Sequence, residues 1–226
     1  MNRLIVSLAA TRLKVAGLLI VLALSLSALY ASVSVQVWIS ADDQLDLYVG
    51  DASGSTLSYI GSTAGWTSIL NTSFSANLTD YLYVVARDTF AVVWGFGGYV
   101  QIGSGSPTPI LVGSGWDAVW IDNLPPPNNL DMPSLSAVQG LIANANTNNL
   151  WAAAVSGTAL PGGGIPNFYD PPSNLLPGLG CIWQVGPSGA QQDYDRILFR
   201  YAVPEPASLL ALGASLAGLA LRRRRK

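Results

Sequence analysis

Val35-Gln36-Val37-Trp38-Ile39 and Leu45-Asp46-Leu47-Tyr48-Val49 both place an apolar side chain at every second position. Because side chains of a β-strand point alternately to its two faces, each stretch predicts a strand with one buried face. Similar runs follow at residues 56–60, 81–87, 90–96, 99–102, 110–112, 116–121, 150–155, 180–184 and 196–202. Roughly ten such runs, separated by Gly, Ser, Asn, Asp and Pro, predict an all-β fold of the β-sandwich or jelly-roll type.

One stretch has helical rather than strand periodicity. Pro133 and Ser134 are suited to start a helix over residues 134–144, although Gly140 weakens that prediction. One side of this helix would carry Leu135, Val138, Leu141 and Ile142. Two stretches rich in Pro, Asn and Gly, residues 123–133 and 160–180, predict surface loops.

The N-terminal residues have the composition of a secretory signal peptide. Three cations, Arg3, Arg12 and Lys14, come before an apolar run over residues 15–29. We expect signal peptidase to cut between Ala28 and Ser34, which assigns residues 1–33 to the signal peptide. An uncleaved signal anchor is the alternative, and with either one the residues that follow are predicted to lie outside the cytoplasm.

A short motif, an apolar run and a basic cluster follow one another at the C-terminal end: Val203-Pro204-Glu205-Pro206, residues 207–221 and Arg222-Arg223-Arg224-Arg225-Lys226. The apolar run predicts a single transmembrane helix, and the five cations should hold its far end in the cytoplasm. The three parts resemble the PEP-CTERM sorting signal of Gram-negative bacteria, and Pro204-Glu205-Pro206 carries the resemblance. The alternative is a plain tail anchor, which has no use for a Pro-Glu-Pro motif.

The PEP-CTERM resemblance implies a route and a destination. In that family an exosortase, a membrane-embedded cysteine protease, cuts at the motif and releases or transfers the protein. Residues 203–226 would then be the sorting signal, and contact with the inner membrane would be transient. The expected final place is the cell surface or the extracellular matrix of a Gram-negative bacterium.

Residues 34–202 remain as a body of single-domain length. The two signals contain eight of the 11 cations, which leaves Arg87, Arg196 and Arg200 in the body. Twelve of the 13 acidic residues, all aspartates, belong to the body, so its formal charge is −9 although the whole chain has −2. This charge excludes nonspecific binding to nucleic acid or to an anionic membrane surface. Calcium or a neutral polymer would suit the body better.

The residue types present exclude most catalytic sites. The chain has no His and a single cysteine, Cys181. It therefore lacks the usual ligand sets for zinc, iron–sulfur clusters and haem. It also cannot form an intramolecular disulfide, and no nucleophile can be activated by a His side chain. Asp193 and Asp195 would share one face of a strand, so glycoside hydrolysis would need a carboxylate from elsewhere. We predict that the protein is not an enzyme, with a glycan-active enzyme as an alternative.

A recurring order of motifs runs through the body. It consists of Ala41-Asp42-Asp43, the strand at residues 45–49, Trp66, residues 78–86, Trp94-Gly95-Phe96 and, later, Gly180-Cys181-Ile182-Trp183 and residues 193–201. This order resembles the galactose-binding-like jelly-roll modules of bacterial surface proteins. The resemblance implies a jelly-roll fold and sugar binding. Gly50-Asp51 departs from the family, which usually has Asn-Gly in that turn.

Tryptophans are candidate platforms for sugar rings, because a flat aromatic face stacks on the apolar face of a sugar. Most of the seven tryptophans are expected to fill the core. Trp38 is predicted to lie on the face opposite Val37 and Ile39, and Trp66 lies in a loop of Gly, Ser and Thr. These two are the candidate glycan-binding residues.

Four aspartates, Asp42, Asp43, Asp46 and Asp51, lie within ten residues of one another. Oxygen ligands at short spacing suit calcium, so the four are candidate ligands for a structural calcium ion, and no other cofactor is predicted. The alternative is turn formation, because Asp side chains accept hydrogen bonds from nearby backbone amides.

Together these observations predict an exported, noncatalytic protein of the surface or extracellular matrix that binds glycan or exopolysaccharide. Its partners would be signal peptidase and an exosortase during export, and extracellular polysaccharide afterwards. The alternative function is that of a structural matrix protein, which assembles with copies of itself through sheet edges or its aromatic surface and does not bind glycan specifically.

Overall fold

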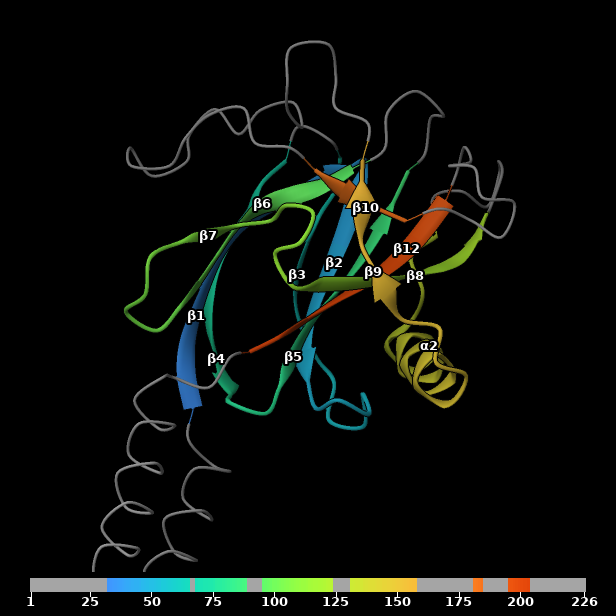
Figure 1. The fold of residues 1–226 in the computed structure, drawn as a ribbon, viewed down its shortest axis with the longest axis horizontal. Coiled ribbons are helices and arrows are strands. Elements are labelled where there is room, and N and C mark those ends of the chain that lie inside the picture. Colours follow the sequence, from blue (N-terminus) through green and yellow to red (C-terminus); the bar gives the residue numbers. More distant parts are fainter. Residues whose placement is uncertain are drawn as a thin grey trace, which may run out of the picture. The chain divides into compact units, whose positions relative to one another are not determined.

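The computed structural model describes residues 32–65, 68–88, 95–123, 131–157, 181–184 and 195–203. Their strands form two sheets of six strands each, which pack face to face around one core (Figure 1). Every strand pairing whose register is described is antiparallel. The predicted all-β sandwich is therefore confirmed. The signal helix and the transmembrane helix that the sequence predicts lie outside the described residues.

Each sheet is assembled from strands that are far apart in sequence. In spatial order, sheet A consists of β10 (Val155–Ser156), β11 (Ile182–Trp183), β6 (Gly95–Ile102), β1 (Ser32–Asp42) and β4 (Leu70–Asn77), with β7 (Thr108–Pro109) paired to β6. Sheet B consists of β3 (Ser58–Thr63), β2 (Gln44–Gly50), β5 (Tyr81–Arg87), β12 (Asp195–Ala202), β8 (Trp116–Asn123) and β9 (Ala152–Ala153). At one side of the sandwich, the last described strands of the two sheets are thus β4 and β3, which are consecutive in sequence.

The alternation seen in the sequence decides which side chains fill the core. The apolar residues of the two opening stretches are buried between the sheets: Val35, Val37, Ile39, Leu45, Leu47 and Val49. From the middle of sheet B, Phe199 enters the same core. Its ring centroid lies 4.9 Å from that of Phe96 and 6.0 Å from that of Trp183, both in sheet A. Burying these rings is a large part of what holds the two sheets together.

Helix α2 (Leu135–Thr147) covers the outer face of sheet B, where the predicted helix is confirmed (Figure 1). Ser134 is its N-cap, and the Ser134 Oγ accepts a hydrogen bond from the backbone N–H of Ala137 (3.3 Å). Val138 and Ile142 are buried against the sheet in a second apolar cluster that includes Tyr48, Tyr83 and Leu198. Sheet B is therefore buried on both faces in this region.

One strand prediction was wrong, and one strand was not predicted. Residues 110–112 do not form a strand; Ile110 is buried and its N–H donates to the carbonyl oxygen of Gly98 (2.9 Å), while β7 lies just before it. Conversely, the sequence predicted no strand at β4. Its alternation is hard to recognise because the inward Leu70, Thr72 and Phe74 are only partly buried and the outward side chains are small and polar.

Other predictions differ mainly in their boundaries. The expected strand at residues 56–60 is β3, shifted toward the C terminus, and residues 99–102 are the second half of β6. The run at residues 150–155 forms the short strands β9 and β10. Residues 90–94 and most of the two predicted loops lie outside the described residues.

The described body begins and finishes at the same end of the sandwich. Asp43, which follows β1, donates its N–H to the carbonyl oxygen of Arg87 at the end of β5 (2.7 Å). Arg87 in turn lies opposite Arg196, the second residue of β12. The end of β1 and the start of β12 thus lie together, so Ser32 and Val203 lie at the opposite end. We call these ends the Asp42 end and the Val203 end.

Among the described residues, no helix has both the length and the apolar character needed to span a bilayer. Residues 207–221, which the sequence predicts to span the membrane, lie outside that part of the chain. Residues 33–204 form one compact unit by themselves.

Candidate functional site

Sheet A turns an uncharged surface outward. Because Val37 and Ile39 point into the core, Trp38 lies on the outer face, as predicted, and is partly exposed. The same alternation on β4 and β6 places further side chains on this face. We call this surface the sheet A face, and it consists of Gln36, Trp38, Asn71, Ser73, Ser75 and Gln101. None of these side chains is charged.

Gln36 organises the polar part of the sheet A face. Its Nε2 donates to Asn71 Oδ1 (2.7 Å), and its Oε1 accepts a hydrogen bond from Ser73 Oγ. Directly opposite Trp38 on β6 is Tyr99, which is only 4 % exposed. Tyr99 therefore backs the surface, while Trp38 supplies its accessible aromatic ring beside fixed amide groups.

The other described tryptophans are packed or bonded within the body. Trp116 and Trp183 are buried in the core. The indole N–H of Trp120 donates to an Asp195 carboxylate oxygen (2.8 Å), and that of Trp151 donates to Asn146 Oδ1 (2.8 Å). Two tryptophans, Trp66 and Trp94, lie outside the described residues. Of the two predicted glycan-binding residues, the structure thus places Trp38 and does not describe Trp66.

Several carboxylates come close together at the Asp42 end. Burial, with the negative charges of Asp43 and Asp88 nearby, raises the pKa of Asp42 to about 7. A backbone hydrogen bond also joins the end of β5 to the start of β12 here, since the N–H of Asp88 donates to the carbonyl oxygen of Asp195 (3.0 Å). The carboxyl of Asp42 is therefore partly protonated near neutral pH.

The single cysteine lies at the same end of the body. Cys181 has a buried thiol. Burial and the nearby charge of Asp42 raise the pKa of Cys181 to about 11. The thiol is consequently protonated at neutral pH, a state that disfavours nucleophilic attack and metal ligation.

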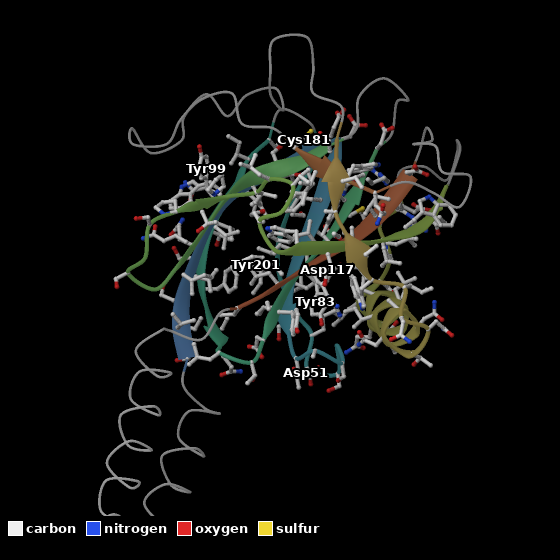
Figure 2. The ribbon with its side chains drawn as sticks, viewed as in Figure 1. Asp51, Tyr83, Tyr99, Asp117, Cys181 and Tyr201 are labelled. Carbon is white, nitrogen blue, oxygen red and sulfur yellow. The ribbon has the colours of Figure 1, made fainter. Side chains whose placement is uncertain are left out.

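The four aspartates predicted as calcium ligands are not brought together. Asp42 and Asp43 lie at the Asp42 end with Cys181, whereas Asp51 follows β2 at the opposite end, as Figure 2 shows for Asp51 and Cys181. Asp46 lies between them, and its carboxylate accepts a hydrogen bond from the Tyr48 hydroxyl (3.2 Å). In the part of the chain that the structure describes, no three Asp, Glu, Cys or His side chains form a group able to hold a metal ion.

Asp51 has the role that the alternative interpretation gave it, in a turn. Its carboxylate accepts hydrogen bonds from the hydroxyls of Ser53 (2.8 Å) and Ser55 (2.6 Å) and from the backbone N–H of Ser55 (2.9 Å). These hydrogen bonds lower the pKa of Asp51 to about 2, and the bond from the Ser55 hydroxyl has the largest effect. The turn after β2 is thereby fixed by a local carboxylate.

The raised pKa of Asp42 predicts a pH-dependent stability. Between the ordinary value of 3.8 and about 7, the folded state holds the Asp42 proton more tightly than the unfolded state does. The free energy of unfolding should therefore fall as the pH rises from 5 to 8, by about 1–2 kcal/mol from this group once solvent screening of the partly exposed carboxyl is taken into account. Urea unfolding at both pH values measures the change.

The matched control is Asp42→Asn, which keeps the shape of the carboxyl group but has no proton to lose. This variant should lose less stability than the wild-type protein over the same pH interval. Equal pH dependence of the two proteins would show that Asp42 ionises normally in the folded state. Asp51 is ionised throughout this interval and does not contribute to the difference.

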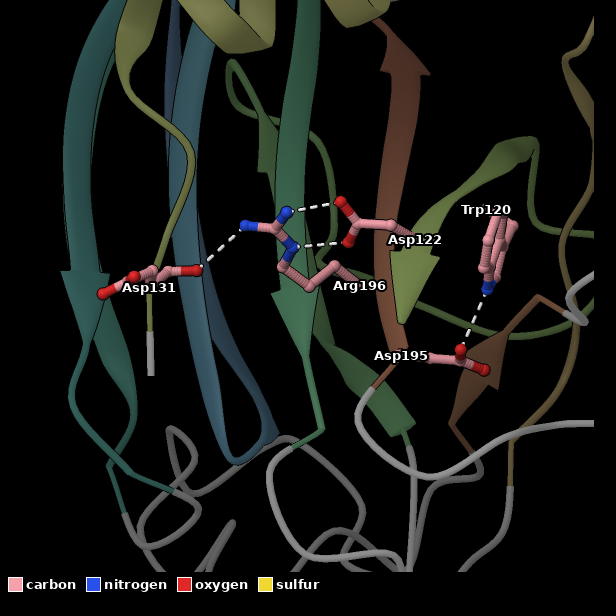
Figure 3. A network of polar contacts seen from close by, with 5 residues as sticks. All are labelled: Trp120, Asp122, Asp131, Asp195 and Arg196. Carbon is pink, nitrogen blue, oxygen red and sulfur yellow. Dashed lines mark hydrogen bonds and ion pairs between the residues drawn. The ribbon is translucent and has the colours of Figure 1, made fainter. Parts of the chain in front are cut away.

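A polar network joins β8, β12 and the segment before α2, and the sequence did not predict it (Figure 3). Arg196 donates from Nε to Asp122 Oδ1 (2.7 Å) and from Nη2 to Asp122 Oδ2 (2.5 Å), and from Nη1 to the backbone carbonyl of Asp131 (2.9 Å). Asp195, on the other face of β12, is fully buried and bonded to Trp120. Asp195, one of the two aspartates that the sequence offers as a hydrolytic acid, is enclosed in the packing between the sheets. Asp193 lies outside the described residues.

A second arginine ties α2 to sheet B. The Nε of Arg200 donates to Asp117 Oδ2 (3.0 Å), and its guanidinium carbon lies 4.2 Å from the centre of the Trp151 ring. A further bond runs from Arg200 Nη1 to Asn146 Oδ1 (3.3 Å), near the C-terminal end of the helix. Two of the three body arginines thus have structural roles on the outer face of sheet B.

The chain leaves the body at a fixed point. Val203, the first residue of the predicted sorting motif, directly follows β12 and is 3 % exposed. Its N–H donates to the carbonyl oxygen of Asp80 (2.9 Å). The rest of the motif, Pro204-Glu205-Pro206, and the basic cluster Arg222-Arg223-Arg224-Arg225-Lys226 lie outside the described residues. The folded body therefore reaches to the residue before the Pro-Glu-Pro tripeptide.

A family model of the PEP-CTERM protein-sorting motif matches residues 202–225. Neither a curated protein nor a solved structure matches the chain. The match confirms the predicted sorting signal: the chain is an exported protein addressed to an exosortase, with a destination at the cell envelope or surface. The likeness of the body to galactose-binding-like modules stays a prediction.

Proposed function

We propose that the body is a noncatalytic module that binds glycan or exopolysaccharide through the sheet A face once the protein has reached the cell surface or the extracellular matrix. The observation that carries this proposal is the partly exposed Trp38 beside uncharged amide and hydroxyl groups. In this account the exosortase cuts at the motif, and the contact with the inner membrane ends there.

The chemistry of the sheet A face suits a neutral sugar polymer. An aromatic ring stacks on the apolar face of a pyranose, and amides both donate to and accept from sugar hydroxyls. The Gln36 and Asn71 amides are held by their mutual hydrogen bond, so little side-chain entropy is lost on binding. The body's formal charge of −9 disfavours a strongly anionic polymer.

Replacing Trp38 with alanine tests this proposal. The change removes the stacking surface, and polysaccharide affinity should fall at least about tenfold, because a central aromatic residue commonly contributes more than about 1.4 kcal/mol to binding. The measurement is a pull-down and a titration with exopolysaccharide from the producing cells, using the exported protein.

The control is Tyr59→Ala, which removes an aromatic ring that is 54 % exposed but belongs to sheet B. This variant should bind polysaccharide like the wild-type protein. Glycan binding that is absent from the wild-type protein, or that survives Trp38→Ala unchanged, would reject the proposed binding surface.

Self-assembly as a structural matrix protein is the second candidate function. It is favoured by the composition of the β3–β4 region, where residues 52–79 include no Asp, Glu, Lys or Arg. Such a region can approach another acidic copy of the chain without local charge repulsion.

A further inference from the structure

β4 is the last described strand of sheet A and has a side that no described strand pairs with. Along that side its backbone N–H and C=O groups pair with no strand in the described part of the chain, and an edge of this kind can extend a sheet. β3, the last described strand of sheet B, lies in contact with β4 at the same side of the sandwich. Among the described strands, both sheets therefore end at one place.

These edges lack the charges by which proteins commonly prevent edge-to-edge pairing. Natural edge strands are protected by Lys, Pro, inward-pointing charges or β-bulges. Neither a charged residue nor a proline occurs in residues 52–79, which contain both strands. β3 does have one protective device, because the β2–β3 register shifts at Ile60 and leaves that residue as a bulge. β4 is therefore the less protected of the two strands.

The side chains of β4 suit continued pairing. Their exposure alternates from Leu70 to Ser75, with Leu70, Thr72 and Phe74 less exposed than Asn71, Ser73 and Ser75. Leu70 and Phe74 pack against the core yet stay partly exposed, and so does Ile60 of β3. Apolar side chains at the core level of the sandwich thus remain accessible at this edge. Another strand beside β4 would cover them.

We propose that β4 is an assembly edge, along which two copies of this chain pair antiparallel so that sheet A continues from one copy into the other. A two-fold axis perpendicular to the sheet relates the copies, so each contributes the same residues. Antiparallel partners directly opposite each other share a face, so the register is centred on Ser73 or on Phe74. Either register places inward residues of one copy opposite inward residues of the other.

The negative charge of the body favours this edge as the place where two copies meet. Two bodies of formal charge −9 repel each other over most of their surfaces. The uncharged region around β4 is where a second copy can approach within hydrogen-bonding distance. Pairing through one shared edge occupies that edge in both copies, so it yields dimers and does not continue into larger oligomers.

The test compares two Thr→Lys variants of the exported protein by sedimentation velocity over a range of concentrations. Thr72 is partly buried and points to the inner side of β4, so Thr72→Lys would place an unpaired charge inside the joined sheets. The dimer dissociation constant of this variant should rise at least about tenfold. Thr147→Lys makes the same change at the exposed end of α2 and should dimerise like the wild-type protein.

Two further measurements keep the outcome decisive. Thermal unfolding of Thr72→Lys shows whether the monomer is intact, and hydrogen exchange of the wild-type protein should slow at residues 70–77 as concentration rises. A wild-type protein that stays monomeric, a dimer that persists in an intact Thr72→Lys variant, or open-ended oligomers would each overturn the proposal. Thr72 is not part of the sheet A face, so glycan binding by Thr72→Lys separates this result from the proposed function.

Discussion

Gly98→Ala is expected to destabilise the body by at least about 3 kcal/mol, a large fraction of the stability of a typical domain. Gly98 lies in β6 opposite Ile39 of β1 and has φ +132°, a conformation that side-chain-bearing residues rarely adopt. A Cβ atom at this position would lie 2.0 Å from the carbonyl oxygen of Trp38. Because that atom belongs to the backbone, the two strands would have to separate.

The separation would affect both the core and the proposed function. β1 supplies Val37 and Ile39 to the core and Trp38 to the sheet A face, so moving it disturbs both. Urea unfolding measures the loss of stability. We expect Gly98→Ala to bind polysaccharide weakly even where it is still folded, because the Trp38 backbone is displaced.

Gly140→Ala is the matched control for this prediction. Gly140 lies inside α2, and a Cβ atom added there meets no described atom within 4 Å apart from its chain neighbours and the adjacent helix backbone. Alanine favours the helix over glycine by about 0.5–1 kcal/mol, so this variant should be slightly more stable than the wild-type protein. Equal stability of the Gly98→Ala and wild-type proteins would contradict the close approach of β1 and β6.

Strands with strict alternation and large apolar residues could be predicted from sequence. β1 and β2 show this alternation, whereas β5 and β12 are nearly continuous apolar runs. All four lie inside the two sheets, where one or both faces are buried. β4 could not be predicted in the same way. It lies at an edge, so its inward Thr72 and Phe74 are only partly buried and the apolar signal is diluted.

Ile110 illustrates the opposite error. Its apolar neighbourhood suggested a strand at residues 110–112, and the side chain is indeed buried. Burial alone does not make a strand, however, because the backbone must also pair. The Ile110 N–H donates to the Gly98 carbonyl oxygen, after which the chain turns, with the Ser114 N–H donating to the Leu111 carbonyl oxygen (3.0 Å).

The candidate site was predictable where it depends on one strand. Trp38 could be placed on the outer face from alternation alone, and the structure agrees. Its polar neighbours could not be predicted, because Asn71 and Ser73 belong to the unpredicted β4 and reach Gln36 only through the sheet. Such contacts depend on which strands are neighbours.

The charged groups show the same limit. Asp42 and Asp43 are adjacent in sequence, and their spacing suggested a metal site. The residues that perturb Asp42 include Asp88, which comes from the end of a distant strand. Likewise Arg196 and Asp122 form an ion pair (2.5 Å) only because β8 and β12 are paired, a fact of topology that no local pattern shows.

Deleting Pro204-Glu205-Pro206 is expected to abolish processing of the C terminus. The family match covers residues 202–225, and the body is folded up to Val203, so the deletion removes the motif and leaves the β12 pairing in place. The apolar run and the five cations would remain, and together they should retain the protein in the membrane. Trp38→Ala is the control, since it changes the sheet A face and should be processed normally.

Fractionation of the producing cells, with mass mapping of the C terminus, tests the central claim most directly. We predict that the wild-type protein is found outside the inner membrane without Arg222-Arg223-Arg224-Arg225-Lys226, and that the deletion variant stays in the membrane with these residues intact. An exported wild-type protein that still ends in Lys226, or a deletion variant that is trimmed and released like the wild type, would contradict the account.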